Sequence, residues 1–209
     1  MPKADTDWKT IKLPEIRALA RPLFLRSQVL PARSTFPMHR HEWHQLVYAI
    51  SGTLSVAVED SWHVVTPDQA IWIPQRVMHT TATSTGAEFR SLYVASGRSP
   101  SMPRTSTVFD VTPLFKALIL ELASFGKRRE DDVYVSQVER LTISQLRRLS
   151  PQDFSLPWPR SKSLHQICDA LFASPGDKRD INHWAAEVGA SVRSLERRFE
   201  DEVGLTFRT

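Results

Sequence analysis

Short β-type runs follow one another over residues 23–95, and this spacing restricts the fold more than any other feature of the sequence. Turn residues separate the runs, as at Ser51-Gly52, where a tight turn is expected, and at Glu59-Asp60-Ser61, where a hairpin turn is expected. Because no helical periodicity interrupts the runs, they predict an all-β sandwich or barrel. We place it in a first domain over residues 1–105.

Three histidines and a glutamine in this region have the chemistry of a metal site. His39, His41 and Gln45 lie two and four positions apart, so on a single strand they share one face, whereas His44 points to the other. His79 is expected on a later strand. Three imidazoles and an amide oxygen that converge inside a barrel form a reasonable cage for a divalent transition metal.

Two uses of this cavity stay open, a metal site and a metal-free pocket for a small organic ligand. A glutamine adds no negative charge, so a divalent ion would stay uncompensated, and the imidazole donors favour zinc or nickel over iron. The aromatic residues that are candidates to line a ligand pocket are Trp43, Tyr48, Trp62, Trp72 and Tyr93.

Composition and the N-terminus indicate a cytoplasmic protein. The single cysteine, Cys168, leaves no internal disulfide and fits a reducing compartment. The first seven residues are polar, which argues against a signal peptide, and no run has the length of a membrane span.

Residues 106–156 predict a helical hairpin with a charged turn at 127–132. Val138 and Leu141 are expected on the apolar face of its second helix. The hairpin either packs on the barrel alone or also forms a homodimer interface, and a homodimer is expected. The apolar stripe of the first helix is Leu114, Leu118, Leu122 and Phe125.

Residues 157–209 predict three short helices. Asp180 is the expected N-cap of the second helix and Ser191 that of the third, on which Leu195 and Phe199 point inward. A short helix, a glycine-containing turn and a helix with a polar free face follow the helix-turn-helix plan.

The free face of that third helix has candidate DNA contacts. Arg193 and Arg197 are four positions apart and project together, with Ser191 and Glu196 nearby. Arginine forks match guanine edges and phosphates. However, residues 158–209 hold eight basic and eight acidic side chains, so the residues alone favour an ordinary solvated helix.

The order of these parts resembles the AraC family of bacterial transcriptional regulators with an N-terminal cupin sensor domain. The two cupin motifs are His39-x-His41-x3-Gln45-x6-Gly52 and Pro74-x-Arg76-x2-His79. Gln45 stands where many metal cupins have glutamate, and Arg76 stands where the motif has glycine. Residues 180–208 are similar to the first DNA-binding motif of the family.

The resemblance implies an α+β multidomain chain: an N-terminal all-β cupin barrel (double-stranded β-helix), a helical hairpin linker and a C-terminal all-α helix-turn-helix unit. It also implies a ligand- or metal-responsive DNA-binding regulator in which Arg193, Glu196 and Arg197 face the major groove. The family's DNA-binding domain has two helix-turn-helix units, so DNA is expected as a partner where the chain continues beyond Thr209.

The alternative is a metal-dependent cupin enzyme, such as a dioxygenase or isomerase, with a helical tail. Such an enzyme needs an open coordination site and a positioned acid or base. The acidic residue beside the cage is Glu42, and its place in the alternation points it away. The sequence therefore favours the regulator over the enzyme.

Overall fold

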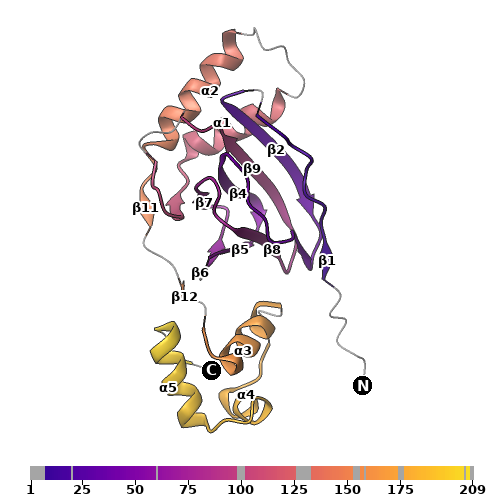
Figure 1. Ribbon diagram of the computed structural model, residues 1–209, viewed down its shortest axis with the longest axis vertical. Helices are drawn as coiled ribbons and strands as arrows, with labels where there is room; N and C mark the ends of the chain where they lie inside the picture. The colour runs from indigo at the N-terminus through magenta and orange to yellow at the C-terminus, as the bar shows by residue number, and fades with distance from the viewer. Residues whose placement is uncertain are drawn as a thin grey trace. The chain divides into compact units, whose positions relative to one another are not determined.

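In the computed structural model, two β-sheets and two helices form one unit of the chain, and three further helices form another (Figure 1). The first unit comprises Met1–Glu59 and His63–Phe154, and the second comprises Asp60–Trp62 and Ser155–Thr209. The structure describes residues 8–19, 21–59, 61–97, 102–125, 133–152, 156–157, 159–173, 177–204 and 206–207.

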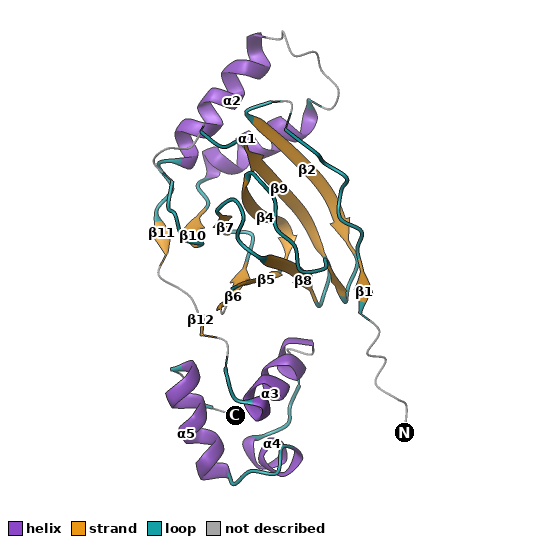
Figure 2. Ribbon diagram, in the orientation of Figure 1, coloured by secondary structure: helices purple, strands orange, loops and turns teal. Residues whose placement is uncertain are grey.

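The strands of the first unit belong to two sheets, which Figure 2 shows in orange. The first sheet has the order β1 (Lys9–Thr10), β3 (Ser34–Thr35), β8 (His79–Thr83), β5 (Leu54–Val58) and β6 (Ser61–Val65). The second sheet has the order β11 (Pro151–Gln152), β10 (Thr107–Asp110), β7 (Gln69–Ile73), β4 (His44–Gly52), β9 (Ala87–Val94) and β2 (Leu23–Leu30).

The main core lies between the two sheets. Val47 and Ile71 of the second sheet and Leu54 and Val56 of the first are all fully buried in one cluster. Neighbouring residues alternate between the two faces of a strand, so Leu46 and its even-numbered neighbours on β4 point to the opposite face. The predicted all-β domain, expected as a sandwich or barrel, is confirmed, and it takes the form of a two-sheet sandwich.

The link at Ser51-Gly52 joins the two sheets rather than two paired strands. β4 pairs with β7 and β9, whereas β5 pairs with β8. Gly52 has a φ of +78°, and a Cβ built on it would lie 2.2 Å from the carbonyl oxygen of Gly86. This close approach of two backbones requires glycine.

Helices α1 (Pro113–Ser124) and α2 (Val133–Leu146) cover the outer face of the second sheet. Thr112 caps α1 by accepting a hydrogen bond from the backbone N–H of Phe115, and Pro113 occupies the first turn as predicted. The buried residues of α1 include Phe115, Leu118 and Ile119.

The predicted apolar stripes of these helices are partly wrong. Leu114 is 49% exposed and Leu141 is 42% exposed, whereas Leu118 and Val138 are buried. The sheet-facing side of α1 is centred on Phe115 and Ile119, which periodicity alone did not select. β10, beyond residue 105, returns to the second sheet, and the predicted turn at 127–132 lies outside the described residues.

The second unit contains α3 (Lys162–Ala173), α4 (Ile181–Glu187) and α5 (Val192–Val203). Asp180 and Ser191 cap α4 and α5, as predicted. β12 (Leu156–Pro157) pairs with Trp62 and Ser61. The core of this unit consists of Leu164, Ile167, Trp184, Ala185, Leu195, Phe199 and Val203. No helix in the described ranges is long and apolar enough to cross a membrane.

Candidate metal and ligand site

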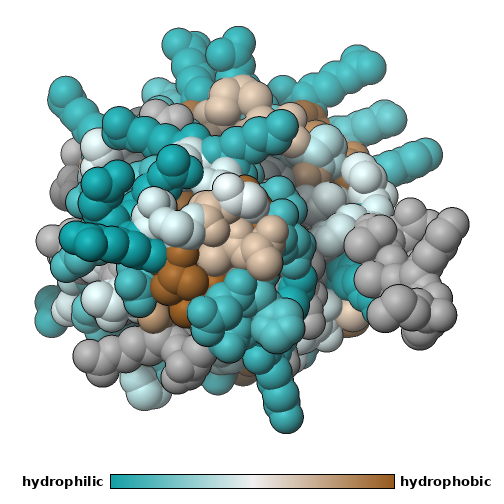
Figure 3. All heavy atoms as spheres, turned by 90° about the horizontal axis from the view of Figure 1, so that it is seen from below, coloured by the Kyte–Doolittle hydropathy of each residue, from teal (hydrophilic) through white to brown (hydrophobic). Residues whose placement is uncertain are grey.

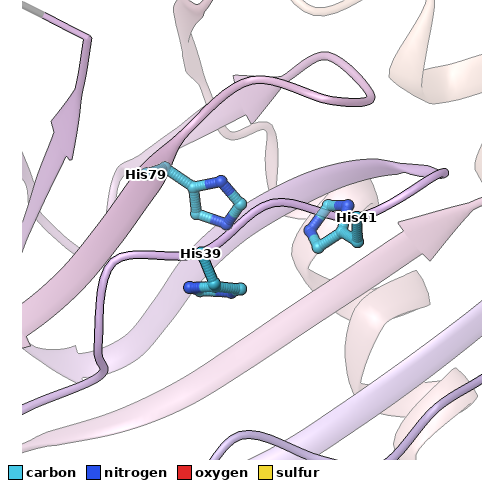
Figure 4. Close-up of side chains that lie close together, drawn as sticks. All are labelled: His39, His41 and His79. Atoms are coloured by element: carbon cyan, nitrogen blue, oxygen red, sulfur yellow. The ribbon is translucent and has the colours of Figure 1, made fainter.

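Three imidazole rings lie close together, as Figure 4 shows. His39, His41 and His79 each offer one ring nitrogen, and these atoms lie within 4.8 Å of one another. The ring centroids are 4.3 Å apart for His39 and His79 and 5.0 Å apart for His41 and His79. The predicted convergence of three histidines therefore exists in the fold.

The prediction that one strand carries His39, His41 and Gln45 is wrong, although the three histidines do lie close together. β4 begins at His44, and His39 and His41 precede it. His39 forms an isolated antiparallel bridge with His79, with both N–O distances 2.9 Å. The bridge places the two rings side by side, a long-range pairing that local alternation does not contain.

A contact between loops fixes His41 and the turn before β8. The backbone N–H of Arg76 donates to the carbonyl oxygen of His41 at 2.8 Å. Arg76 has a φ of +66°, a conformation that favours glycine, the residue that the cupin motif has at this position. Its guanidinium pairs with the Glu42 carboxylate at 2.7 Å, and both side chains are 70% exposed.

Each ring of the cluster is oriented by a backbone carbonyl. The Nδ1 atoms of His39, His41 and His79 lie 2.9, 2.7 and 2.9 Å from the carbonyl oxygens of Pro37, Trp43 and Val77. A carbonyl only accepts, so each Nδ1 carries the hydrogen, and in the neutral ring Nε2 keeps its lone pair. This carbonyl contact is typical of metal-binding histidines.

Gln45 faces the lone pairs of two of these rings. Its Oε1 lies 2.7 Å from Nε2 of His41 and 3.0 Å from Nε2 of His79. Its amide nitrogen donates to Oγ of Ser91 at 2.7 Å. In this orientation of the amide, an acceptor oxygen faces two acceptor nitrogens, and the three atoms are stabilised when they coordinate one shared cation, so the arrangement fits a metal ion.

Burial favours the neutral form of two of these imidazoles, His39 and His79, and the neutral form is the one that binds a metal. Burial lowers the pKa of His79 to about 3, with the charges of His39 and His41 acting in the same direction. Burial also lowers the pKa of His39, with contributions from His41 and Arg26. Around neutral pH the Nε2 lone pairs of His39 and His79 are therefore free of protons.

The donor set fits a divalent transition metal with modest tightening. Two nitrogens on a tetrahedral zinc ion, each about 2.1 Å from it, are about 3.4 Å apart, which is closer than the widest separation in this cluster. His39 and His41 are half-buried while His79 is fully buried, so one side of the cluster is open to solvent. The residues that would hold the ion are His39, His41, His79 and Gln45.

Two of the five predicted pocket aromatics contact the cluster. The ring of Trp43 stacks on His41 with centroids 5.0 Å apart, and Tyr93 meets His41 edge-on at 5.6 Å. Trp43 and Tyr93 also contact each other at 5.6 Å. Together they form an aromatic wall beside His41.

The other three predicted pocket aromatics point elsewhere. Tyr48 on β4 and Trp72 on β7 point away from the histidine cluster and pack with the helices. His44 stacks on Trp72 with ring centroids 5.0 Å apart, so His44 points away from the cluster, as predicted. Trp62 and the exposed Val64 alternate with buried positions on β6, so Trp62 lies on the outward face. On β4, strand parity relative to Gln45 would have removed Tyr48, whereas the sequence holds no such reference residue for Trp62 and Trp72.

Sequence reasoning missed Ser91 and Arg26. Ser91 is fully buried and orients Gln45, and Arg26 lies opposite Ser91 in the β2–β9 register. Neither residue belongs to a cupin motif. No local pattern marks them, because β2 and β9 carry other polar side chains as well, and only the pairing of the two strands places them here.

The candidate DNA contacts lie on the free face of α5. Arg193, Glu196 and Arg197 are exposed, and Leu195 and Phe199 are buried, as predicted. The hydroxyl of Ser191 caps the helix by accepting from the N–H of Ser194. The view in Figure 3 shows extended hydrophilic side chains around a small hydrophobic patch.

Comparisons with known proteins give the family and the fold. The family model described as the AraC-like ligand binding domain matches residues 24–178. The HTH-type transcriptional regulator NimR of Escherichia coli K12 is 27% identical over 174 residues, which cover 83% of this chain and 63% of NimR. The chain thus spans less than two thirds of that relative.

Among solved structures, the AraC-like transcriptional activator CuxR is similar in fold, with a TM-score of 0.50 at 13% identity over 86% of this chain and 70% of CuxR. The first unit is thus a β-sandwich with two sheets plus helices. With the family model matching most of its length, the chain belongs to the family of AraC-like ligand-binding domain proteins.

Proposed function

We propose that this protein is a bacterial ligand- or metal-responsive DNA-binding transcriptional regulator that acts in the cytoplasm. Its membership of the AraC-like family and its likeness to a transcriptional regulator support this function. The observation that carries the sensing role is the convergence of His39, His41 and His79 in the sandwich. We divide the chain into a sensor over 1–105, a helical hairpin over 106–156 and a helix-turn-helix unit over 157–209.

The three imidazoles and Gln45 hold a divalent metal in this proposal, with zinc or nickel favoured over iron by the imidazole donors. When bound, the metal supplies a Lewis-acid position at the open side of the cluster. Metal analysis of purified protein tests this directly. The expected result is near-stoichiometric metal in the wild type and none in His41→Ala. After both proteins are treated with a chelator, their thermal stabilities should be the same.

In the DNA-binding role, α4 supports α5, which enters the major groove. Gly189, with a φ of +64°, makes the turn between them, and Leu195 anchors α5 in the core. Arg193 and Arg197 then face bases and phosphates, and Glu196 beside them faces the bases. Arg198, in contrast, donates to Oγ of Ser163 on α3 and serves as the matched control.

The experiment is selection of binding sites from genomic fragments, followed by titration of the selected site. We expect Arg197→Ala to weaken binding by about tenfold or more and Arg198→Ala to have a smaller effect. Equal losses from both variants, or no selected site with a chain extended beyond Thr209, would contradict the DNA-binding role.

A homodimer formed through the helical hairpin completes the proposal. A groove of about 430 Å³ runs between α1 and α2, lined by Leu118, Tyr134, Val138 and Leu141 among others. Leu120 is 45% exposed on the same hairpin. Sedimentation of Leu141→Glu against the wild type tests this interface, and an unchanged mass would contradict it.

The enzyme alternative requires a positioned acid or base at the open coordination site. Glu42, the carboxylate that the sequence places beside the cluster, is exposed and paired with Arg76. No observation in the described residues favours catalysis over sensing.

A further inference from the structure

The metal donors of this site are all neutral, which has a consequence for the ligand. Three imidazoles and one amide oxygen leave a divalent ion with its full charge, and burial of an uncompensated charge is unfavourable. The Glu42 carboxylate is already paired with Arg76. An anion that binds at the open side would supply the missing charge.

A second positive charge lies on the same face of the sheet. Arg26 of β2 is opposite Ser91 of β9 in the antiparallel register, so both side chains project to the side that carries Gln45. Its guanidinium lies over the ring of Phe36, 5.2 Å from the centroid, and donates to Oε1 of Gln28.

The guanidinium of Arg26 still has hydrogen bonds to give. Within the described ranges, no carboxylate pairs with Arg26, and its strand neighbour Ser91 holds Gln45 against the imidazoles. A guanidinium presents a planar fork of donors that suits a carboxylate. Arg26 is therefore placed to bind an anion that reaches the imidazole cluster.

The wall beside the cluster suits the rest of a ligand. Phe24 stacks on Tyr93 with centroids 6.0 Å apart, and Trp43 contacts both Tyr93 and His41. Nε1 of Trp43 is shielded from solvent and has no acceptor among the residues that the structure describes. This wall thus presents aromatic, largely apolar surface to a ligand.

We propose that the effector is a small organic carboxylate. Its anionic group lies between the imidazole cluster and Arg26, and its apolar body packs on Trp43 and Tyr93. The inference rests on the proposed sensor function and its metal. It adds the chemical class of the ligand and names Arg26 as the residue that selects its charge.

The test uses cobalt(II) as a spectroscopic metal and benzoate as the probe, with benzamide as its neutral counterpart. The full chain is loaded with cobalt(II), and each probe is titrated while visible absorption and heat are recorded. We expect benzoate to perturb the cobalt spectrum and to bind at least about tenfold more tightly than benzamide.

Two variants assign the selectivity. Arg26→Gln should weaken benzoate binding at least about tenfold and leave benzamide unchanged, whereas Arg140→Gln, exposed on α2, should change neither. Gln45→Glu places a negative charge among the donors and should also weaken benzoate binding. This second variant keeps the test decisive where Arg26→Gln perturbs the fold.

The outcomes separate the two proposals. If the protein binds cobalt but has equal affinities for benzoate and benzamide, the carboxylate inference is overturned and the metal site stands. The same conclusion follows if neither Arg26→Gln nor Gln45→Glu weakens benzoate binding. Failure of the wild type to bind cobalt overturns the metal site itself, and the carboxylate inference falls with it.

Discussion

The amide nitrogen of Gln45 donates a hydrogen bond of 2.7 Å to the hydroxyl of Ser91. This bond turns Oε1 toward the imidazoles of His41 and His79. A hydroxyl also donates, so Ser91 can equally hold the reversed amide, in which the NH₂ group faces the two Nε2 atoms. A glutamine thus suits the cluster with a cation and without one, whereas a glutamate suits the cation alone.

Replacement of Gln45 by glutamate should tighten metal binding. The added negative charge compensates the ion, and we expect a dissociation constant for zinc lower by about tenfold, equivalent to about 1.4 kcal/mol. Competition with a chromophoric chelator measures it. Ser91→Ala should act in the opposite direction, because it releases the amide that presents Oε1.

The matched control for this charge is Glu42→Gln. Glu42 is 70% exposed and its carboxylate pairs with Arg76, so its loss should leave zinc affinity unchanged. Equal affinities of the wild type and Gln45→Glu would show that position 45 does not contribute a ligand.

Acid should destabilise the metal-free protein through His79. An unfolded histidine has a pKa of 6.5, whereas burial lowers the pKa of His79 in the fold to about 3. Between these values the unfolded chain binds a proton that the folded chain does not, so the free energy of unfolding decreases as pH falls below 6.5. The slope for one such proton approaches about 1.4 kcal/mol per pH unit.

Urea unfolding of chelator-treated protein between about pH 7 and about pH 5 measures this slope. His79→Gln should flatten it by about one proton, while His165→Gln, on the exposed surface of α3, should not. A slope that is the same in His79→Gln and the wild type would assign the acid sensitivity to other groups.

The sequence predicted what depends on local pattern and the cupin motifs. The caps Asp180 and Ser191 follow from side-chain chemistry at helix starts, and the inward Leu195 and Phe199 follow from helical periodicity. The convergence of the histidines followed from the motif spacing, although His39 reaches His79 through an isolated bridge rather than along β4.

The errors in the predicted ligand pocket concern which face of each strand points to the other sheet and which points to the helices. Tyr48 and Trp72 were expected in the ligand pocket, yet they pack under the helices because both faces of the second sheet are covered. With apolar residues on both sides, alternation no longer marks the interior. Arg26 and Ser91 became visible only through the register of β2 and β9.

Loss of the cap at Ser191 should destabilise the second unit. Its hydroxyl accepts the hydrogen bond of the Ser194 N–H at the start of α5. Ser191→Ala should lower the free energy of unfolding of this unit by about 1 kcal/mol, and Ser191→Asn, a neutral alternative cap, should restore most of it. Hydrogen exchange at the N–H of Ser194 reports the cap directly, and equal exchange in all three proteins would contradict it.

Alanine at Gly52 should be far more damaging than alanine at another glycine of similar conformation. A Cβ at Gly52 would lie 2.2 Å from the carbonyl oxygen of Gly86, whereas one at Gly97 would meet nothing within 4 Å, and their φ angles are +78° and +83°. Both substitutions carry the conformational penalty of a positive φ, about 1–2 kcal/mol, so the difference between their losses of unfolding free energy isolates the close approach of the backbones at Gly52 and Gly86.

We expect Gly52→Ala to lose at least about 2 kcal/mol more unfolding free energy than Gly97→Ala in urea unfolding, because the backbone of the link between the sheets has to move. Equal losses would mean that the strands separate at this point without affecting the sandwich. A larger loss at Gly52 would place the crossing from β4 to β5 among the contacts that hold the sensor together.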